Sequence, residues 1–274
     1  MPSTMSTSTT SAWSRSARRW ASVAPTLPAP TTVILDRTAG DSTEPYRCRG
    51  VAASRLMATT RRLPAGAKQR ALLTVQRLAG AYPEAHTELR FNDPFQLLVA
   101  VILSAQTTDV RVNLVTPGLF ARYPDAAAFA VAEPGELEAV LRPTGFFRSK
   151  TRAVIEMSQD LVRLHGGEVP GQMEELVKLR GVGRKTANVV LGVAFGVPGF
   201  PVDTHVQRLT RLLRLTTATD PEKIEADIMR MVPAAEWTEL SLRLILHGRR
   251  ICVARRPRCR DCVLNDFCPS AFRA

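Results

Sequence analysis

The sequence predicts an all-α protein, and three observations carry that prediction. Apolar residues recur at helical spacing from residue 68 onward. No segment shows the alternation of apolar and polar residues that is typical of a strand. Helix start signals, an Asp followed by a Pro, stand at Asp93 and at Asp220. With 274 residues, of which 45% are hydrophobic, the chain can form one or two packed domains.

The predicted helices follow one another closely along the chain. The first has one apolar face, formed by Leu72, Leu73, Val75, Leu78 and Ala79. The second begins at Pro94 and is apolar nearly all round, so we expect it at the centre of the core. Pro117 should kink or split the helix that comes next. Further helices are expected over residues 125–132, 134–142, 149–165, 172–179, 186–195, 203–215 and 236–250, and from 221 onward.

The composition excludes several classes of protein. The longest unbroken apolar runs cover residues 97–103 and 126–132, which are far too short to span a bilayer, so we expect no membrane partner. Five cysteines in 274 residues are too few for a fold that is held together mainly by disulfide bonds. Because 37 Lys and Arg residues outnumber 25 Asp and Glu residues, the net charge is +12 and nucleic acid is the leading candidate partner. A basic surface that is merely solvated is the alternative.

Half of the excess charge lies in residues 1–62, which we expect to form a disordered leader. This segment has nine Arg and no Lys against three acidic residues, and it has no apolar periodicity. Three interpretations stay open: a flexible basic arm that adds DNA affinity, an organelle transit peptide, or a start assigned too early, with Met57 as one later candidate. We favour the first and the third. Cys48 in this leader is expected to be incidental.

Four cysteines near the C-terminus have the spacing of a metal centre. The pattern is C-x6-C-x2-C-x5-C, formed by Cys252, Cys259, Cys262 and Cys268. A [4Fe–4S] cluster requires four Cys and tolerates irregular spacing, whereas zinc sites with four Cys more often use two short knuckles. We therefore expect a [4Fe–4S] cluster, with zinc as the alternative.

Six arginines surround these cysteines, at positions 249, 250, 255, 256, 258 and 260. Such a density of charge is costly unless an anion neutralises the arginines or water solvates them well. We interpret the loop as a phosphate clamp, with Arg249, Arg255 and Arg256 as DNA contacts. The alternative, which is compatible with the first, is that the arginines offset the negative charge of a thiolate-ligated cluster.

A glycine-rich turn between two predicted helices holds the most reactive candidate residue. In residues 179–187, Gly181 and Gly183 permit positive φ, and the N–H groups that open the second helix can bind a phosphate oxygen. Lys185 lies in the first turn of that helix beside Arg184, so the helix dipole and the neighbouring cation disfavour its ammonium form. A Lys amine of this kind is a nucleophile for a sugar aldehyde. A solvated or phosphate-binding Lys is the alternative.

Asp203 stands at the start of another predicted helix. As a single observation, this position indicates an N-cap. A carboxylate at a helix N-terminus also stays ionised at neutral pH, so near Lys185 it could stabilise a cationic sugar transition state.

Together these motifs resemble the endonuclease III family of DNA glycosylase/AP lyases, in the helix-hairpin-helix superfamily. The resemblance covers residues 68–268 and rests on residues 103–109, 181–190 and 202–205 and on the four-Cys loop. Each motif is modest alone, but their joint order and spacing are highly specific. The chain departs from the family's pattern at Arg180, where Pro is usual, and we expect this Arg to add a phosphate contact.

The resemblance implies two all-α domains with a DNA-binding cleft between them. One is a six-helix barrel over residues 87–197 that contains the hairpin. The other is an iron–sulfur cluster domain that joins residues 63–86 to residues 198–274.

The resemblance also implies roles for single residues. Lys185 matches the nucleophile and Asp203 the catalytic carboxylate. Gln106 matches a residue that fills the gap left by a flipped nucleotide, and Phe146 lies where the family places a wedge beside the opposite strand. A core Phe is the alternative for Phe146. The turn residues Gly181, Gly183 and Arg184 are expected to contact DNA.

The implied function is base excision repair by a bifunctional DNA glycosylase and AP lyase. It would remove oxidised or ring-saturated pyrimidines and cut the abasic strand 3′ to the site by β-elimination, through a Schiff base on Lys185. The expected partner is double-stranded DNA with a damaged base or an abasic site, bound by a monomer in the bacterial cytoplasm. A monofunctional adenine-mismatch glycosylase and a non-catalytic iron–sulfur DNA-binding protein are the alternatives.

Overall fold

The computed structural model describes residues 62–273. Every regular element in this range is a helix and none is a strand, so the predicted all-α class is confirmed. Residues 1–61, which include Cys48 and nearly all of the predicted leader, lie outside the described residues. None of the described helices is both long enough and apolar enough to cross a membrane.

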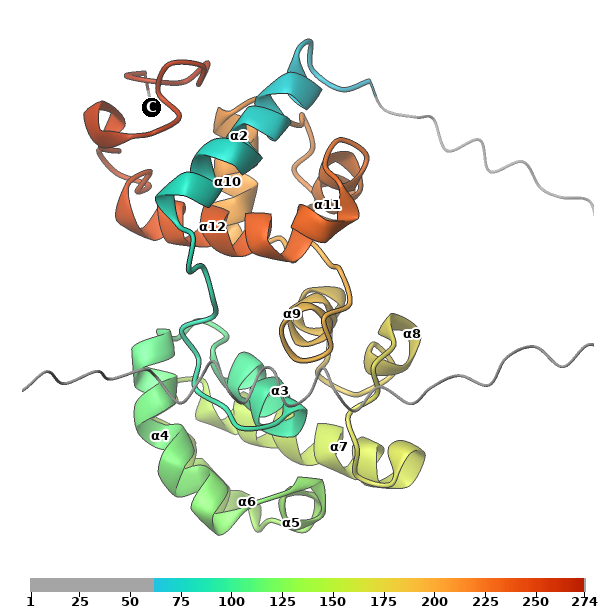
Figure 1. Ribbon diagram of the computed structural model, residues 1–274. Coiled ribbons are helices and arrows are strands. Elements are labelled where there is room, and N and C mark those ends of the chain that lie inside the picture. Colours follow the sequence, from blue (N-terminus) through green and yellow to red (C-terminus); the bar gives the residue numbers. More distant parts are fainter. Residues whose placement is uncertain (1–61, 274) are drawn as a thin grey trace, which may run out of the picture. The chain divides into compact units, whose positions relative to one another are not determined.

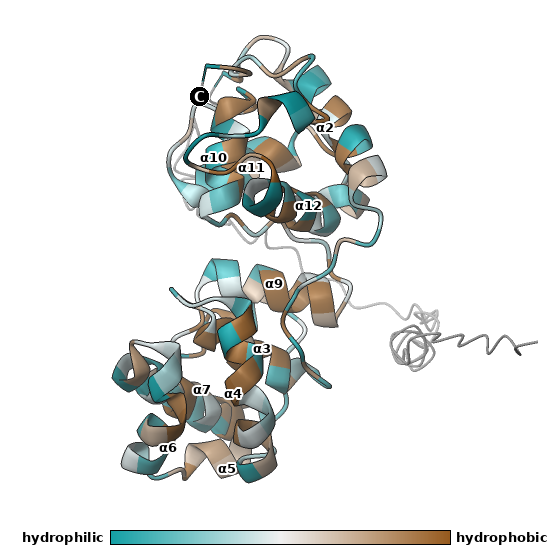
Figure 2. Ribbon diagram, turned by 90° about the vertical axis from the view of Figure 1, so that its left-hand side faces the viewer, coloured by the Kyte–Doolittle hydropathy of each residue, from teal (hydrophilic) through white to brown (hydrophobic). Residues whose placement is uncertain are grey.

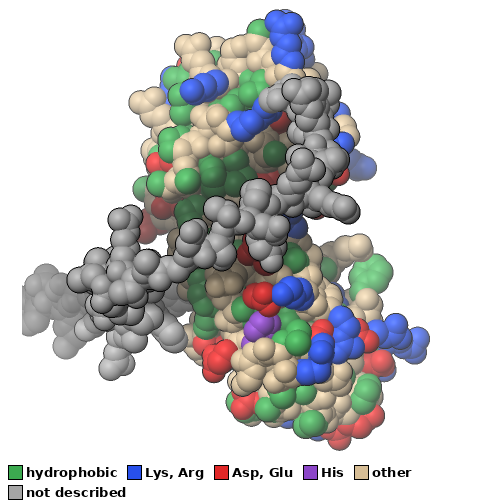
Figure 3. Space-filling model, turned by 90° about the vertical axis from the view of Figure 1, so that its right-hand side faces the viewer, with side chains coloured by type: hydrophobic (Ala, Val, Ile, Leu, Met, Phe, Trp, Pro, Cys, Tyr) green, Lys and Arg blue, Asp and Glu red, His purple; other side chains and the backbone are tan. Residues whose placement is uncertain are grey.

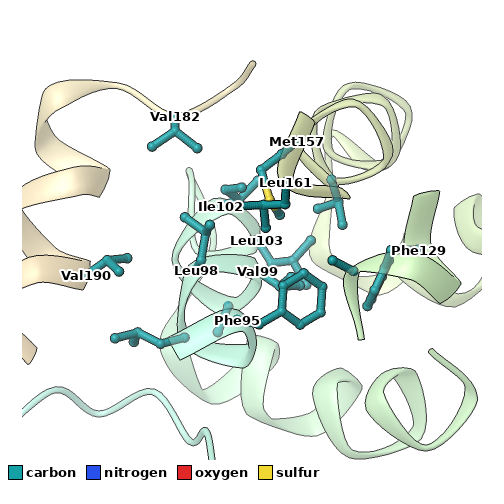
Figure 4. Close-up of a cluster of buried hydrophobic side chains, with 14 of the residues drawn as sticks. Phe95, Leu98, Val99, Ile102, Leu103, Phe129, Met157, Leu161, Val182 and Val190 are labelled. Atoms are coloured by element: carbon teal, nitrogen blue, oxygen red, sulfur yellow. The ribbon is translucent and has the colours of Figure 1, made fainter. Parts of the chain in front are cut away.

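The first hydrophobic core is built around α3 (Pro94–Leu103). Seven of its ten residues are buried, as its all-round apolar sequence predicts. The carboxylate of Asp93 caps the helix by accepting a hydrogen bond of 2.8 Å from the backbone N–H of Gln96. Figure 4 shows the side chains of α3 between those of α7 and α9. The other elements around this core are α4 (Asp109–Arg122), α5 (Ala126–Ala130), α6 (Pro134–Leu141), η1 (Arg142–Thr144), α7 (Phe147–His165), α8 (Met173–Leu176) and α9 (Arg184–Ala194).

Two elements differ from the predicted ones. Helix α4 continues through Pro117 as one helix, so of the two expected outcomes, a kink or a split, the split is wrong. Val112, Thr116 and Leu119 are buried on either side of the proline, and this packing offsets the backbone hydrogen bond that Pro117 cannot donate. Helix α8 covers only four residues, because backbone turns replace regular helix from Val177 to Leu179.

The second hydrophobic core joins parts of the chain that are far apart in sequence. Helix α2 (Ala67–Ala81) packs against α12 (Trp237–Arg250), which also contacts α10 (Thr204–Leu212). The remaining elements are α11 (Pro221–Met229), η2 (Ala234–Glu236) and η3 (Cys259–Asp261). Figure 1 shows α2 beside α12. In Figure 2 the helices carry apolar residues on one side and polar residues on the other, as amphipathic packing requires.

The loop before the hairpin is fixed to α7 by Arg180; the phosphate contact expected of this Arg stays a prediction, and a phosphate would have to compete with a carboxylate for it. The buried carboxylate of Asp160, with 3% of its side chain exposed, accepts hydrogen bonds from the backbone N–H of Arg180 at 3.0 Å and from its Nε at 2.8 Å. Arg163 Nη2 donates a further bond at 2.9 Å. The hydrogen bonds from the Arg180 side chain hold the pKa of Asp160 well below its usual range.

Replacing Asp160 by Asn should destabilise the fold at neutral pH. The amide keeps the volume but loses the charge, so we expect the free energy of unfolding to fall by about 2 kcal/mol. Because the folded-state pKa is lowered, the carboxylate stabilises the protein above the unfolded-state pKa, and this stabilisation is lost as the pH falls below about 4. Urea titrations of both chains at pH 7 and pH 3 should show a smaller difference at pH 3. An equal difference at both values would contradict this account.

Candidate active site

The hairpin turn is held close to α7 by its first glycine. Gly181 has φ +78°, and a Cβ there would lie 3.1 Å from the Cβ of Ala153. Gly183 does not adopt positive φ: its φ is −89°, and a Cβ there would meet nothing within 4 Å. Gly183 is instead the N-cap of α9, and no side chain caps the helix. The first N–H groups of α9 therefore remain open to an anion.

The two cations that open α9 differ in their surroundings. Arg184 is bound by the buried Glu225 through two hydrogen bonds, from Nε at 2.9 Å and from Nη2 at 2.8 Å. The Glu225 carboxylate raises the pKa of this guanidinium. Lys185 is exposed and makes no hydrogen bond or ion pair with any described residue. Only the lysine is therefore free to meet a reactant.

Asp203 is the N-cap of α10, as its position in the sequence predicts. Its Oδ1 accepts a hydrogen bond of 2.8 Å from the backbone N–H of Val206. The segment before it is fixed to α12, because Ser241 Oγ donates to the carbonyl of Pro201 at 2.6 Å and Thr238 Oγ1 donates to that of Gly199 at 3.1 Å. The carboxylate is therefore held at a rigid helix end.

Lys185 and Asp203 make no direct hydrogen bond or ion pair. Their helices are coupled through Glu225 on α11. This buried carboxylate binds Arg184 and also Asn188, both on α9, and α11 in turn contacts α10. The coupling depends on pairs far apart in sequence, so Glu225 was missed in the sequence analysis.

Gln106 and Phe146 project from two loops at the surface of the first core. Both have a left-handed backbone, with φ of 53° and 47°, which is uncommon for residues other than glycine. Gln106 is exposed, and 65% of Phe146 is exposed. The alternative of a core Phe at position 146 is therefore wrong. Its neighbour Phe147 packs against the core instead.

The predicted phosphate-binding arginines fall into two groups. Arg249 is held by two carboxylates, Glu88 and Asp109, with a hydrogen bond of 2.9 Å to the latter. Although burial alone would lower its pKa, these carboxylates raise it. Arg255 and Arg256 are exposed, and Arg256 has φ +58°. On the face shown in Figure 3, basic side chains are interspersed with acidic ones, so the net charge does not form one continuous basic surface there.

The four predicted cysteine ligands line one small pocket, with a cavity volume of about 30 Å³, beside the end of α12. No group of three or more His, Cys, Asp or Glu in residues 62–273 is placed to hold a single metal ion. A zinc site needs four thiolates about 2.3 Å from one point. In a [4Fe–4S] cluster each thiolate binds a different iron, so the sulfurs stay apart around a shared space. Four cysteines that line one pocket supply the number and kind of ligands that a [4Fe–4S] cluster needs.

Three of the four cysteines would have to lose a proton in order to bind a metal. Burial raises the pKa of the Cys252 thiol to about 11, and it raises the pKa values of Cys262 and Cys268. Without a metal these groups would be neutral thiols near pH 7, whereas metal ligation requires thiolates. The positive charge of bound iron would supply the missing stabilisation.

A histidine contacts one of these sulfurs. His247 Nε2 lies 3.3 Å from Cys262 Sγ, and its Nδ1 lies 3.0 Å from the hydroxyl oxygen of Tyr82. Burial lowers the pKa of His247 to about 4, so the ring is neutral at pH 7. With the Tyr82 hydroxyl donating to Nδ1, the ring N–H lies on Nε2 and donates to the sulfur.

Replacing Cys268 by Ser tests the predicted metal centre, because we expect the variant to lose it and to have a looser C-terminal loop. Between Ile251 and Arg273 the regular structure is limited to η3, and Cys252, Cys262 and Cys268 pack against the second core beside the buried Leu264. We expect loss of the brown colour and of bound iron, and a melting temperature lower by about 10 °C. Cys48→Ser is the matched control, because this cysteine lies outside the ligand set. Full iron content in Cys268→Ser would exclude Cys268 as a ligand.

The geometry agrees with comparisons to known proteins. The family model "HhH-GPD superfamily base excision DNA repair protein" matches residues 99–234. Endonuclease III of Synechocystis sp. is 50% identical over 216 residues, which cover 78% of this chain and 99% of that protein. The chain belongs to the endonuclease III family. The activity expected from the resemblance, that of a bifunctional DNA glycosylase/AP lyase of base excision repair, is therefore confirmed.

Solved structures of endonuclease III place this fold on DNA. A non-covalent endonuclease III–DNA complex is 40% identical, with a TM-score of 0.72, and the match covers 74% of this chain and 96% of that one. A trapped endonuclease III–DNA covalent intermediate is 41% identical, with the same TM-score and the same coverage. Endonuclease III is thus a family in which a covalent link between protein and DNA has been captured.

Proposed function

We propose that Lys185 and Asp203 carry the chemistry of this member of the endonuclease III family. The observation that carries the proposal is the contrast between the two adjacent cations of α9. Arg184 is bound to a buried carboxylate, while Lys185 is exposed and unpartnered among the described residues. The covalent intermediate solved for a relative requires a nucleophile on the protein, and a free amine next to an anion-binding helix end meets that requirement.

The first step joins the protein to the sugar. The neutral amine of Lys185 attacks C1′ of the extruded nucleotide, the Nζ–C1′ bond forms, and the bond between C1′ and the base breaks. The leaving base takes up the proton that Nζ loses after the new bond forms. The ring bond between C1′ and O4′ then breaks, O4′ takes up a proton from water, and a Schiff base between Nζ and C1′ remains.

The second step cuts the strand. The Schiff base makes the C2′ proton acidic, and loss of that proton is followed by cleavage of the C3′–O bond on the 3′ side of the site. The carboxylate of Asp203, fixed at the end of α10, stabilises the positive charge that develops on the sugar and assists these proton transfers. Water then releases the amine of Lys185.

We infer that double-stranded DNA with a damaged base or an abasic site is the partner. The open N-terminus of α9, with the turn at Gly181 and Gly183, would bind a phosphate. Gln106 and Phe146 would enter the duplex, which their exposure supports. Arg255 and Arg256 would contact the backbone. Arg184 and Arg249 are held by carboxylates, so a phosphate would have to compete for them.

The substrate class is oxidised or ring-saturated pyrimidines, carried over from the family. The cysteine pocket would hold a [4Fe–4S] cluster, which would keep the loop that carries Arg255 and Arg256 in place.

We infer two domains, because one core consists of residues from 89–191 and the other of residues from 67–78 and 200–264. We also propose that the chain acts as a monomer in the cytoplasm, where bacterial DNA lies. The DNA-binding cleft between the domains stays a prediction.

Borohydride trapping tests the proposal on the wild-type chain. Borohydride reduces a Schiff base to a stable amine, so duplexes with an abasic site or an oxidised pyrimidine should both become linked to the protein. The sequence has only five lysines, at positions 68, 150, 178, 185 and 223, which makes peptide mapping of the adduct decisive. We expect the adduct on Lys185.

Each other outcome has a definite meaning. An adduct formed only on the abasic duplex would leave a lyase without the proposed base range. An adduct on another lysine would overturn the assignment of Lys185. Excision without any adduct would favour the monofunctional alternative, and tight DNA binding with neither excision nor adduct would favour a non-catalytic binder.

A further inference from the structure

Lys150 is a buried cation without an acidic partner. It lies in the first turns of α7, is 4% exposed, and forms no ion pair with an acidic residue in the described part of the chain. Burial lowers the pKa of its ammonium group. Its place near the start of a helix adds an unfavourable interaction with the helix dipole. Burying an unpaired charge is costly, so this position requires a compensating role.

The hydrogen bonds of Lys150 join two loops. Its Nζ donates to Thr107 Oγ1 at 2.8 Å and to the carbonyl oxygen of Thr144, also at 2.8 Å. Thr107 Oγ1 donates to the same carbonyl oxygen. One ammonium group therefore closes a three-way junction between the loop after α3 and the loop before α7.

The junction lies directly beneath the two exposed side chains that we assign to the DNA. Thr107 follows Gln106 in the chain, and Thr144 precedes Phe146 by two residues. Gln106 and Phe146 both have a left-handed backbone conformation, which costs about 1 kcal/mol for a residue other than glycine. Such conformations persist only when the surroundings fix them, and hydrogen bonds from a charged donor are the stronger kind.

We propose that Lys150 is a positioning residue that holds the loops of Gln106 and Phe146 at a fixed separation, so that both side chains enter the duplex together. This inference rests on the proposed function of those two residues. It assigns Lys150 no contact with the DNA. The junction would act before the chemical steps, because it positions the two side chains that promote extrusion of the damaged nucleotide from the duplex.

The test follows base extrusion and excision separately. A duplex carries an oxidised pyrimidine opposite 2-aminopurine, whose emission rises when it loses its stacking partners. In Lys150→Met, which keeps the length of the side chain, we expect the emission rise to fall to a third or less and the single-turnover excision rate to fall at least tenfold. Thr107→Val, which removes one arm of the junction, should lower both about threefold. Lys68→Met on α2 is the matched control for loss of a lysine and should change neither.

A double-mutant cycle separates positioning from a general loss of structure. In the Lys150→Met background, Gln106→Ala should have no further effect on the emission, because the loop that carries Gln106 is already displaced. Effects that multiply, or full emission in both Lys150→Met and Thr107→Val, would overturn the inference. A wild-type chain that binds the duplex without any rise would overturn the roles of Gln106 and Phe146 and this inference with them. A wild type that raises the emission but excises nothing would overturn only the proposed chemistry, and the emission would still test Lys150.

Discussion

A chain with Lys185 replaced by Ala should form no borohydride-trapped adduct and should cut abasic DNA at least about 10³-fold more slowly than wild type. The expected loss is large because the amine supplies the covalent bond itself, and no other described residue makes that bond in the proposed mechanism. Lys185 is exposed and has no partner among the described residues, so the substitution should change the free energy of unfolding by less than about 0.5 kcal/mol. Cleavage would be followed on end-labelled duplex with one abasic site.

Binding must be measured beside cleavage, because Lys185 also carries a charge near the open end of α9. Removal of one phosphate contact should weaken binding without abolishing it. The slope of the logarithm of the binding constant against the logarithm of the salt concentration should become smaller by about one. Lys178→Ala is the matched control, since this lysine lies seven residues earlier, is exposed and pairs only with Glu175. An adduct that persists in Lys185→Ala would show that another amine is the nucleophile.

Helix ends were the part of the fold that the sequence predicted best. Asp93, Asp203 and Asp220 each accept a hydrogen bond from the backbone N–H three residues later, as the sequence indicates. Gly166 ends α7 in the left-handed conformation for an equally local reason. These signals depend on neighbouring residues alone. Pro117 shows the limit of such signals, because burial on both sides of it overrides its local preference.

Charge pairing was the part that the sequence could not predict. Arg184 and Arg249 stand in motifs that suggest free phosphate-binding cations, yet Glu225 and the pair Glu88 and Asp109 hold them. The partners lie 41 to 161 residues away, and nothing in the composition marks them. The same holds for Asp160 with Arg180 and for Lys150 with its two loops. In each case the tertiary fold, rather than the motif, decides which cation is available.

Replacing Asp203 by Asn should separate its two roles, capping and catalysis. Asn is as good an N-cap as Asp, so the hydrogen bond to the Val206 N–H and the melting temperature should be retained. The negative charge is lost, so the developing cation on the sugar loses its stabilising partner. We expect the single-turnover rate of base excision to fall by about 10²- to 10³-fold.

The comparison with Asp203→Ala makes this prediction decisive. Ala removes the charge and the cap, so it should reduce excision as much as Asn does and also lower the free energy of unfolding by about 1 kcal/mol. If Asp203 only capped α10, Asn would keep full activity, and a loss in Ala could come only from displacement of the helix end. Because Ser241 and Thr238 hold the preceding segment from α12, the helix end should stay in place even in the Ala variant. Equal loss in both variants, with only one of them destabilised, therefore assigns the effect to the charge.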